Sequence, residues 1–206
     1  MVMSDHGFKP FRRQVNINTW LVKNNYVELL SEWSPEDEYF ASVKWSNTKV
    51  YALGINGVYI NLKGRERNGV IQPGKEYQKL VDEVTAKLEA MVDPKTGHRV
   101  IRKAYKKYET YHGPYTDIGP DIVLGFYQGY RTSDESALGQ FSKEIITDNS
   151  RKWSGDHCMD YREVPGIILM NRTIQMEAPS LYDLAPTILK EFGIEPLREM
   201  FGRPIY

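Results

Sequence analysis

Two short motifs in the chain contain side chains that commonly bind metal ions, and the first lies close to its start. "VMSDHGF" (residues 2–8) places Asp5 and His6 side by side, after two apolar residues and before Gly7. Adjacent side chains of a strand point to opposite faces, so two neighbours reach one ion most easily where a strand ends, and Gly7 permits that turn. A carboxylate and an imidazole together suit Zn²⁺, Mn²⁺ or iron. The alternative is a capped turn with a solvent-exposed histidine.

The second motif is "WSGDHCMD" (residues 153–160), in which a glycine again precedes an Asp-His pair. A flexible approach followed by His157 suits a metal ligand that a loop delivers, and the alternative is a plain polar loop. Cys158 is a soft donor that could bind zinc. A single cysteine more commonly packs as a small apolar residue, so the sequence favours packing for Cys158.

The two remaining histidines are not assigned to a metal site. His98 falls in the turn "PKTGH" and is expected to be exposed. His112 lies in "ETYHGPY"; it could line a pocket, but a hydrogen-bonded structural histidine is the favoured interpretation.

The segment "NLKGRERNG" (residues 61–69) could approach a phosphate group. Asn61 and Arg65 could donate hydrogen bonds to phosphate oxygens, and Gly64 would let the backbone come close. The alternative is a turn after a strand, with Arg65 paired to an acid. The sequence favours this alternative, because "GRE" already places opposite charges next to each other.

The periodicity of apolar residues predicts an α/β fold, with a mostly parallel sheet flanked by helices. The clearest helix is expected over residues 75–91, because apolar residues recur every three or four positions from Leu80 to Met91. A second helix is expected over 181–192, between Ser180 and Gly193, and a short one after Asn18 as its N-cap. Strands are expected at residues 2–3 and near 50–53, 58–62, 122–125 and 166–170, the last of them buried.

The composition excludes several classes of protein. Lys plus Arg equals Asp plus Glu at 27 each, so the charge indicates neither a nucleic-acid scaffold partner nor an anionic membrane. The basic cluster within residues 102–107 is expected to be a solvated face. No apolar run reaches membrane-spanning length and no signal peptide is visible. A single cysteine fits a reducing compartment, so a cytoplasmic protein is expected.

Several blocks of the sequence occur in an order that resembles one known family. These blocks are "VMSDHGF", "GVYINLKGRERNGVI", "YHGPYTDIGPDIVLGFYQGYR", "WSGDHCMD…VPGIILMNR" and "APSLYDLAPTILKEFGIEPLREMFGRPI". The chain resembles, from Val2 to Pro204, the predicted phosphohydrolases and phosphomutases of the alkaline phosphatase superfamily, close to the type I phosphodiesterases/nucleotide pyrophosphatases. The resemblance implies an enzyme that hydrolyses phosphate esters, either phosphodiesters or phosphomonoesters, with nucleotides among the candidates.

The resemblance also implies two divalent metal ions, with zinc favoured over manganese. Asp5 and His6 match the Asp-His pair that binds one ion, and His157 matches the later histidine that binds the other. Such a pair of ions activates a hydroxyl nucleophile and stabilises the phosphoryl oxygens during in-line displacement.

Family members are longer than this chain and carry a metal-binding Asp and a Ser or Thr nucleophile ahead of the segment matched by "VMSDHG". None of the four histidines here follows an Asp four residues earlier. Residues 1–206 are therefore expected to be the C-terminal part of a metal-dependent phosphohydrolase, incomplete at the N-terminus and inactive in isolation. A missing N-terminal segment, or a separate chain that supplies it, would be a partner. The alternative is a non-catalytic remnant of the family that binds a metal or a partner.

Overall fold

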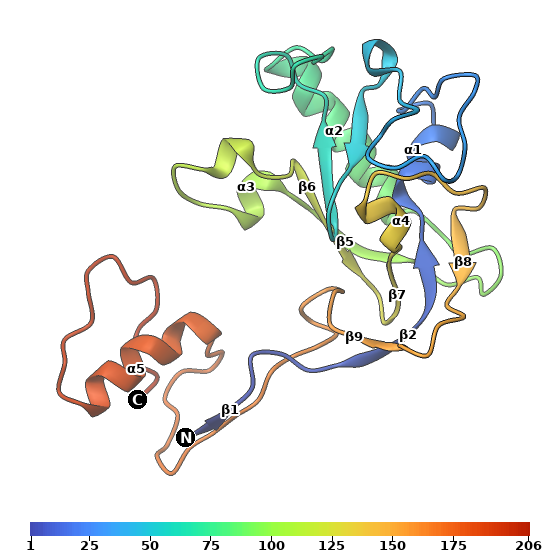
Figure 1. The fold of residues 1–206 in the computed structure, drawn as a ribbon. Coiled ribbons are helices and arrows are strands. Elements are labelled where there is room, and N and C mark those ends of the chain that lie inside the picture. Colours follow the sequence, from blue (N-terminus) through green and yellow to red (C-terminus); the bar gives the residue numbers. More distant parts are fainter. The chain divides into compact units, whose positions relative to one another are not determined.

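The computed structural model describes residues 1–206, which form two compact units. The central unit is the continuous segment Phe8–Val164. The terminal unit joins the two ends of the chain, Met1–Gly7 and Pro165–Tyr206 (Figure 1). No helix in the chain combines the length and apolar composition that a bilayer crossing requires.

A four-stranded sheet of the central unit has the order β3-β4-β6-β5, and each neighbouring pair of strands is antiparallel. The strands are β3 (Val50–Ala52), β4 (Gly57–Ile60), β5 (Ile101–Lys106) and β6 (Ile122–Phe126). Between β3 and β4, Gly54 and Asn56 adopt positive φ angles of 70° and 67°. Such left-handed backbone in a short connection reverses the chain tightly, so β3 and β4 form a hairpin.

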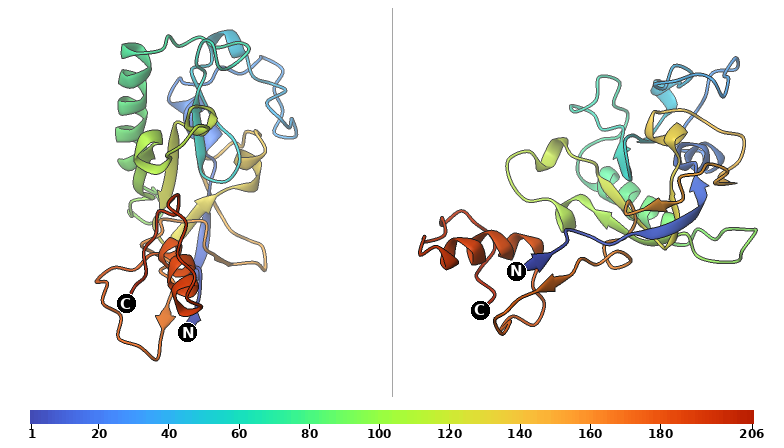
Figure 2. Two further views of the ribbon diagram at one scale, coloured as in Figure 1. Left: turned by 90° about the vertical axis from the view of Figure 1, so that its left-hand side faces the viewer. Right: turned by 60° about the horizontal axis from the view of Figure 1, so that its bottom comes forward.

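Helix α2 (Lys75–Glu89) packs against β5 of this sheet (Figures 1 and 2). Its buried face includes Leu80, Val84 and Leu88, which recur at the spacing of one helical face. The helix predicted over 75–91 is therefore confirmed to within two residues.

A second sheet of the central unit is built around β2 (Lys9–Val15). β2 pairs parallel with β7 (Gly129–Thr132) and antiparallel with β8 (Ile146–Asp148). The start of β2 also pairs antiparallel with β9 (Gly155–Asp156), with Lys9 opposite Asp156. Because β9 ends one residue before His157, this pairing fixes the loop that carries the histidine.

The predicted fold class, an alkaline-phosphatase-like α/β fold with a mostly parallel sheet flanked by helices, is wrong. The sheets are antiparallel or mixed, and β2–β7 is the one parallel pair of strands. Neighbouring parallel strands need a crossover of a dozen or more residues, usually a helix. The only helix of that length, α2, leads from β4 to β5, and these two strands are not neighbours in the sheet.

Shorter helices complete the central unit: α1 (Ile17–Lys23), η1 (Trp45–Asn47), α3 (Lys107–Thr110), η2 (Thr116–Ile118) and α4 (Asp134–Ala137). The N-cap of α1 is Asn16, so the predicted cap at Asn18 is wrong by two residues. Asn18 is fully buried, and its amide donates to the carbonyl oxygens of Ala52 and Ser136. Tertiary hydrogen bonds therefore use the side chain that was expected to cap the helix.

In the terminal unit, β1 (Val2–Met3) pairs antiparallel with β10 (Ile168–Leu169), as Figure 2 shows. The strand expected over 166–170 is shorter than predicted and not buried, since Leu169 is 62% exposed. The helix expected over 181–192 is confirmed as η3 (Leu181–Asp183) followed by α5 (Leu184–Glu191).

The hydrophobic core of the central unit draws on both sheets and on helices α1 and α2. Val15, Leu21, Ile60, Leu88 and Leu124 are each no more than 1% exposed. Strands near 50–53, 58–62 and 122–125 were predicted from these apolar runs and are confirmed to within two residues.

Candidate metal centre

Asp5 and His6 bring two potential ligand atoms together in the terminal unit. β1 ends at Met3, so the pair lies just beyond the end of a strand, as the sequence predicts. Asp5 Oδ2 lies 3.3 Å from His6 Nε2, and Asp5 Oδ1 accepts the backbone N–H of His6 at 3.0 Å. The side chain of Asp5 is 66% exposed and that of His6 29% exposed. The two side chains therefore face one point without being buried in the fold.

A hydrogen bond sets the protonation of the His6 ring. His6 Nδ1 lies 3.0 Å from the carbonyl oxygen of Gly7, which can only accept, so this contact favours a proton on Nδ1. Nε2, the nitrogen beside Asp5, is then the one with a lone pair for a metal ion. Zn–N and Zn–O distances of about 2.0–2.1 Å put neighbouring tetrahedral ligands about 3.3 Å apart. The Asp5–His6 pair thus fits a single divalent ion.

A pocket of about 320 Å³ lies beside Asp5 within the terminal unit. Ser4 and Asp5 form one wall, and residues around β10 and the start of η3 form the others. The hydroxyl of Ser4 accepts the backbone N–H of Ile167 at 3.0 Å, and the Ser4 N–H donates to the Ile167 carbonyl. Ser4 therefore ties the Asp5–His6 segment to β10.

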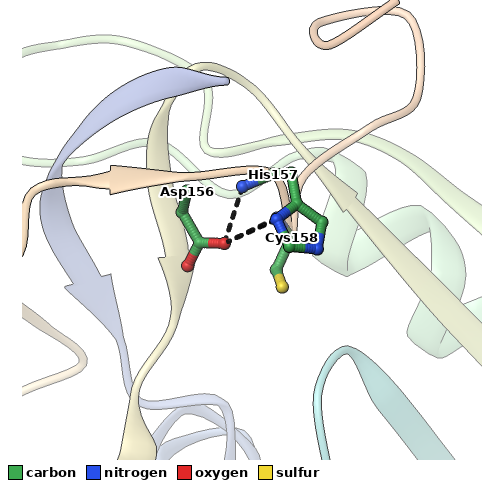
Figure 3. Close-up of side chains that lie close together, drawn as sticks. All are labelled: Asp156, His157 and Cys158. Carbon is green, nitrogen blue, oxygen red and sulfur yellow. Dashed lines mark hydrogen bonds and ion pairs between the residues drawn. The ribbon is translucent and has the colours of Figure 1, made fainter. Parts of the chain in front are cut away.

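Asp156, His157 and Cys158 gather three further donors in the central unit. One oxygen, nitrogen or sulfur atom from each of these side chains lies within 4.8 Å of the others (Figure 3). His157 Nδ1 is 3.8 Å from Asp156 Oδ1. The His157 ring is 45% exposed and meets the Phe8 ring edge-on at a centroid distance of 5.4 Å. The sequence predicts His157 as a ligand, but the convergence of Cys158 with it is a new observation.

Asp156 is the buried anchor of this cluster. Its Oδ1 accepts the backbone N–H groups of His157 and Cys158, at 2.6 and 2.9 Å. Its Oδ2 lies 3.0 Å from the guanidinium of Arg131. Burial alone would raise the pKa of the Asp156 carboxyl, but these N–H groups, the Cys158 thiol and the Arg131 charge hold it below its usual value. Asp156 is therefore an anion that orients the two residues after it.

Burial and the hydrogen bond with Asp156 raise the pKa of the Cys158 thiol to about 11. Without a metal ion, Cys158 is a neutral thiol at pH 7 and a weak nucleophile. A bound cation reverses this preference, because a coordinating thiol loses its proton.

Asn61 and Arg65, the predicted phosphate donors, lie at the end of β4 with most of their donors in use. Asn61 is fully buried, and its amide donates to the carbonyl oxygens of Trp45, Thr48 and Asn68. Arg65 donates to Glu66 through Nε, at 2.7 Å. The structure thus contains the ion pair that the alternative interpretation of "GRE" describes, and contact of either residue with phosphate stays a prediction.

A buried carboxylate that the sequence analysis did not single out organises the surroundings of Arg65. Asp121 accepts from both terminal nitrogens of Arg65, at 2.9 and 2.6 Å, and from the hydroxyl of Tyr77 at 2.8 Å. Lys107 Nζ lies 3.0 Å from the same carboxylate and is 4% exposed, so the expected solvated basic face is wrong at Lys107. Burial would raise the pKa of Asp121, but hydrogen bonds from Arg65 and from the Ile60 N–H lower it.

Arg65, Tyr77 and Lys107 also line a pocket of about 420 Å³ in the central unit, together with the exposed Lys63 and with Tyr108. Lys107 Nζ lies over the rings of Tyr77 and Tyr108, at 5.7 and 5.5 Å from their centroids. The pocket therefore combines two aromatic side chains with three cations, two of which are paired with Asp121, and with the carboxylate of Asp117. No pattern in the sequence marks it, because Asp121 is far from Arg65 along the chain.

His98 and His112 are both exposed, so the expectation of exposure at His98 is confirmed.

Comparison with known proteins gives one match. The model of a family described as "Type I phosphodiesterase / nucleotide pyrophosphatase" matches residues 1–157. The matched segment contains Asp5 and His6 and ends at His157. No curated protein and no solved structure matches the chain.

Proposed function

The chain belongs to the type I phosphodiesterase / nucleotide pyrophosphatase family, a family of phosphodiesterase- and pyrophosphatase-type hydrolases, and we propose that it carries metal ligands of such an enzyme. Asp5 and His6 bind one divalent ion, and His157 binds another. The substrate is a phosphate ester, either a phosphodiester or a phosphomonoester.

The geometry of Asp5 and His6 carries this proposal. The ligand atoms are 3.3 Å apart, and the hydrogen bond to Gly7 leaves the lone pair of His6 on the nitrogen next to Asp5. Both properties are expected of a metal-binding pair and neither is needed for a capped turn. When bound, the ions would polarise the phosphoryl oxygens and lower the pKa of a hydroxyl nucleophile.

On the substrate side, we propose that Arg65 adds positive charge to the pocket that it shares with Lys63 and Lys107. Arg65 is held by Asp121 and Glu66, so its guanidinium is fixed in place before a ligand arrives. Asn61 supports the same pocket indirectly. Its amide donates to the carbonyl oxygens of Thr48 and Asn68 and so holds the loop after β4, which carries Lys63 and Arg65. An anionic ester group would meet Lys63 there, and it would compete with Asp121 for Arg65 and Lys107.

The 206-residue chain alone is proposed to have little or no activity on phosphate esters. The hydroxyls nearest the ligands in sequence are those of Ser4 and Ser154. Ser4 Oγ accepts a hydrogen bond from Ile167, which commits it to the β1–β10 pairing. Ser154 lies in the connection before β9, where its carbonyl accepts the N–H of Phe11. Neither stands at a helix N-terminus that would lower the pKa of a hydroxyl.

The test measures binding and turnover of two esters, p-nitrophenyl phosphate and bis-p-nitrophenyl phosphate. With Zn²⁺ or Mn²⁺ present, calorimetry should show binding of at least one ester, and a chelator should abolish it. Release of nitrophenolate should be very slow or undetectable. A chain that binds the metal but neither ester would be a non-catalytic metal-binding protein, and the proposal would fall. Rapid turnover that disappears in His157→Ala would contradict only the predicted lack of activity, and the proposed metal ligands would stand.

A further inference from the structure

Cys158 is the only cysteine of the chain, and its sulfur lies in the cluster with Asp156 and His157. The thiol is half-buried and stands directly after the residue that is proposed to bind the second ion. Of these three residues the proposed function uses only His157, so it gives the adjacent sulfur no role.

We propose that Cys158 Sγ is a ligand of the same metal ion as His157, which makes this a zinc site with mixed nitrogen and sulfur donors. The inference rests on the proposed function for the presence of an ion at His157. On binding, the Cys158 S–H bond breaks, its proton goes to solvent, and both electrons stay on sulfur to form the bond to the metal. The oxidation states of metal and sulfur do not change.

The geometry brings the donors close to coordination distance. With Zn–S and Zn–N distances of about 2.3 and 2.1 Å, two neighbouring ligands of one tetrahedral ion lie about 3.6 Å apart. The donor atoms here lie within 4.8 Å of one another. The sulfur and the ring nitrogen would therefore have to approach each other by at most about 1.2 Å on binding, and rotation about the side-chain bonds of the half-exposed His157 changes this distance.

Asp156 acts as the positioning residue. Its buried carboxylate accepts the backbone N–H groups of both His157 and Cys158, so one side chain fixes the backbone of both proposed ligands. The guanidinium of Arg131 compensates the charge of that carboxylate on its far oxygen. Oδ1 remains on the side of the imidazole, 3.8 Å from Nδ1, where it can accept from a ring N–H or serve as a third donor.

A sulfur ligand determines which metal this site selects. Thiolates are soft donors that favour zinc over manganese or magnesium, whereas the oxygen and nitrogen of Asp5 and His6 tolerate all of these ions. The two proposed ions should therefore differ in selectivity, with zinc or cobalt held at His157–Cys158.

The test uses the spectroscopy of cobalt in the full 206-residue chain. Co²⁺ bound to a thiolate gives a charge-transfer band in the near ultraviolet, and Cys158 is the only residue that can produce it here. The band should appear on titration with Co²⁺, disappear on addition of Zn²⁺, and be lost in Cys158→Ser. It should also be lost or strongly weakened in His157→Ala, because the two residues share the ion. His98→Ala is the matched control and should leave it unchanged.

Alkylation of Cys158 gives a second readout that needs no variant. Saturating Zn²⁺ should slow the reaction of the thiol with iodoacetamide at least tenfold, and a chelator should restore the rate. Metal binding that requires His6 and His157, but gives no thiolate band and no protection, would overturn the role of Cys158 and leave the proposed function standing. A thiolate band that survives in His157→Ala would also overturn the proposal that Cys158 and His157 bind the same ion.

Discussion

His6 Nε2 lies 3.3 Å from Asp5 Oδ2, while the other ring nitrogen of His6 donates to the carbonyl of Gly7. Two adjacent residues are brought to this spacing because β1 ends at Met3 and the chain is free to turn. With the proton on Nδ1, the Nε2 lone pair and the carboxylate oxygen can both bind a cation placed between them. A metal ion then has two ligands oriented before it binds.

Substitution of Asp5 should affect metal binding and not folding. Asp5→Asn removes the charge of an exposed side chain, so the melting temperature should stay within about a degree of wild type. Zinc affinity, measured by calorimetry, should fall by at least about tenfold, because an amide oxygen is a weaker ligand than a carboxylate. Asp82→Asn, on the exposed side of α2, is the control and should bind zinc like wild type. Equal affinities in both variants would remove Asp5 from the site.

A glycine in β6 should be required for packing. A Cβ on Gly125 would lie 2.4 Å from Asp160 Oδ2, and Asp160 is buried and held by Arg162 and the hydroxyl of Tyr105. Gly125→Ala should therefore lower the free energy of unfolding by about 1–3 kcal/mol in urea titrations.

The matched control for Gly125 is Gly155→Ala in β9, where a Cβ meets no atom within 4 Å. It should leave the free energy of unfolding nearly unchanged. Similar losses in the two variants would show that the contact with Asp160 does not limit packing.

Removal of the Asp121 charge should make stability less dependent on pH at the acid end. The folded-state pKa of Asp121 lies below its unfolded value of about 3.9. Its charge therefore contributes stability that is fully present above pH about 4 and is lost as the pH falls through the lower folded-state pKa.

Asp121→Asn leaves Arg65 and the buried Lys107 without their carboxylate, so a loss of about 3 kcal/mol is expected at pH 7. The difference from wild type in the free energy of unfolding should shrink between pH 4 and pH 2. Asp117→Asn, at an exposed site, is the control and should stay close to wild type. A difference that is constant across this range would contradict the role assigned to Asp121.

The cationic pocket should contribute to ester binding through Lys63 and Arg65. Lys63→Ala removes an exposed charge and should weaken binding of p-nitrophenyl phosphate by roughly three- to tenfold, which corresponds to the loss of about one ordinary, solvent-exposed hydrogen bond. Lys75→Ala, exposed at the start of α2, is the control and should have no effect. Arg65→Ala should weaken ester binding and also lower the melting temperature, because Asp121 loses its bidentate partner. Unchanged ester affinity in Lys63→Ala and Arg65→Ala would exclude this pocket.

The parts of the fold that depend on local pattern could be predicted from the sequence. α2 follows from the spacing of Leu80, Val84 and Leu88, and the last helix from the residues at its two ends. The direction of the sheets could not be predicted, because it depends on which strands become neighbours. The turn with positive φ at Gly54 and Asn56 makes β3 and β4 antiparallel, and this direction cannot be read from the apolar pattern of the two strands.

In the candidate site, too, residues in short motifs could be selected from the sequence, and residues placed by tertiary contacts could not. The Asp-His pairs are visible as motifs, but only the resemblance to a family selected Asp5, His6 and His157 as ligands, and that assignment stays a prediction. Cys158 was given a packing role because a lone cysteine carries no spacing information. Its approach to His157 depends on two hydrogen bonds to Asp156, and the spacing Asp-x-Cys is the one signal that could have indicated them. Lys107 was expected in solvent because its partner, Asp121, comes from a different element.

The most direct test of the proposed metal ligands is calorimetric titration of Zn²⁺ into the chain and three histidine variants. His6→Ala and His157→Ala should each lose a zinc-binding event, or weaken it by at least about tenfold, because each removes a ligand of a different ion. His98→Ala removes an exposed imidazole of the same type and should bind zinc like wild type. If His6→Ala and His157→Ala titrate like His98→Ala, these histidines are not metal ligands and the account is contradicted.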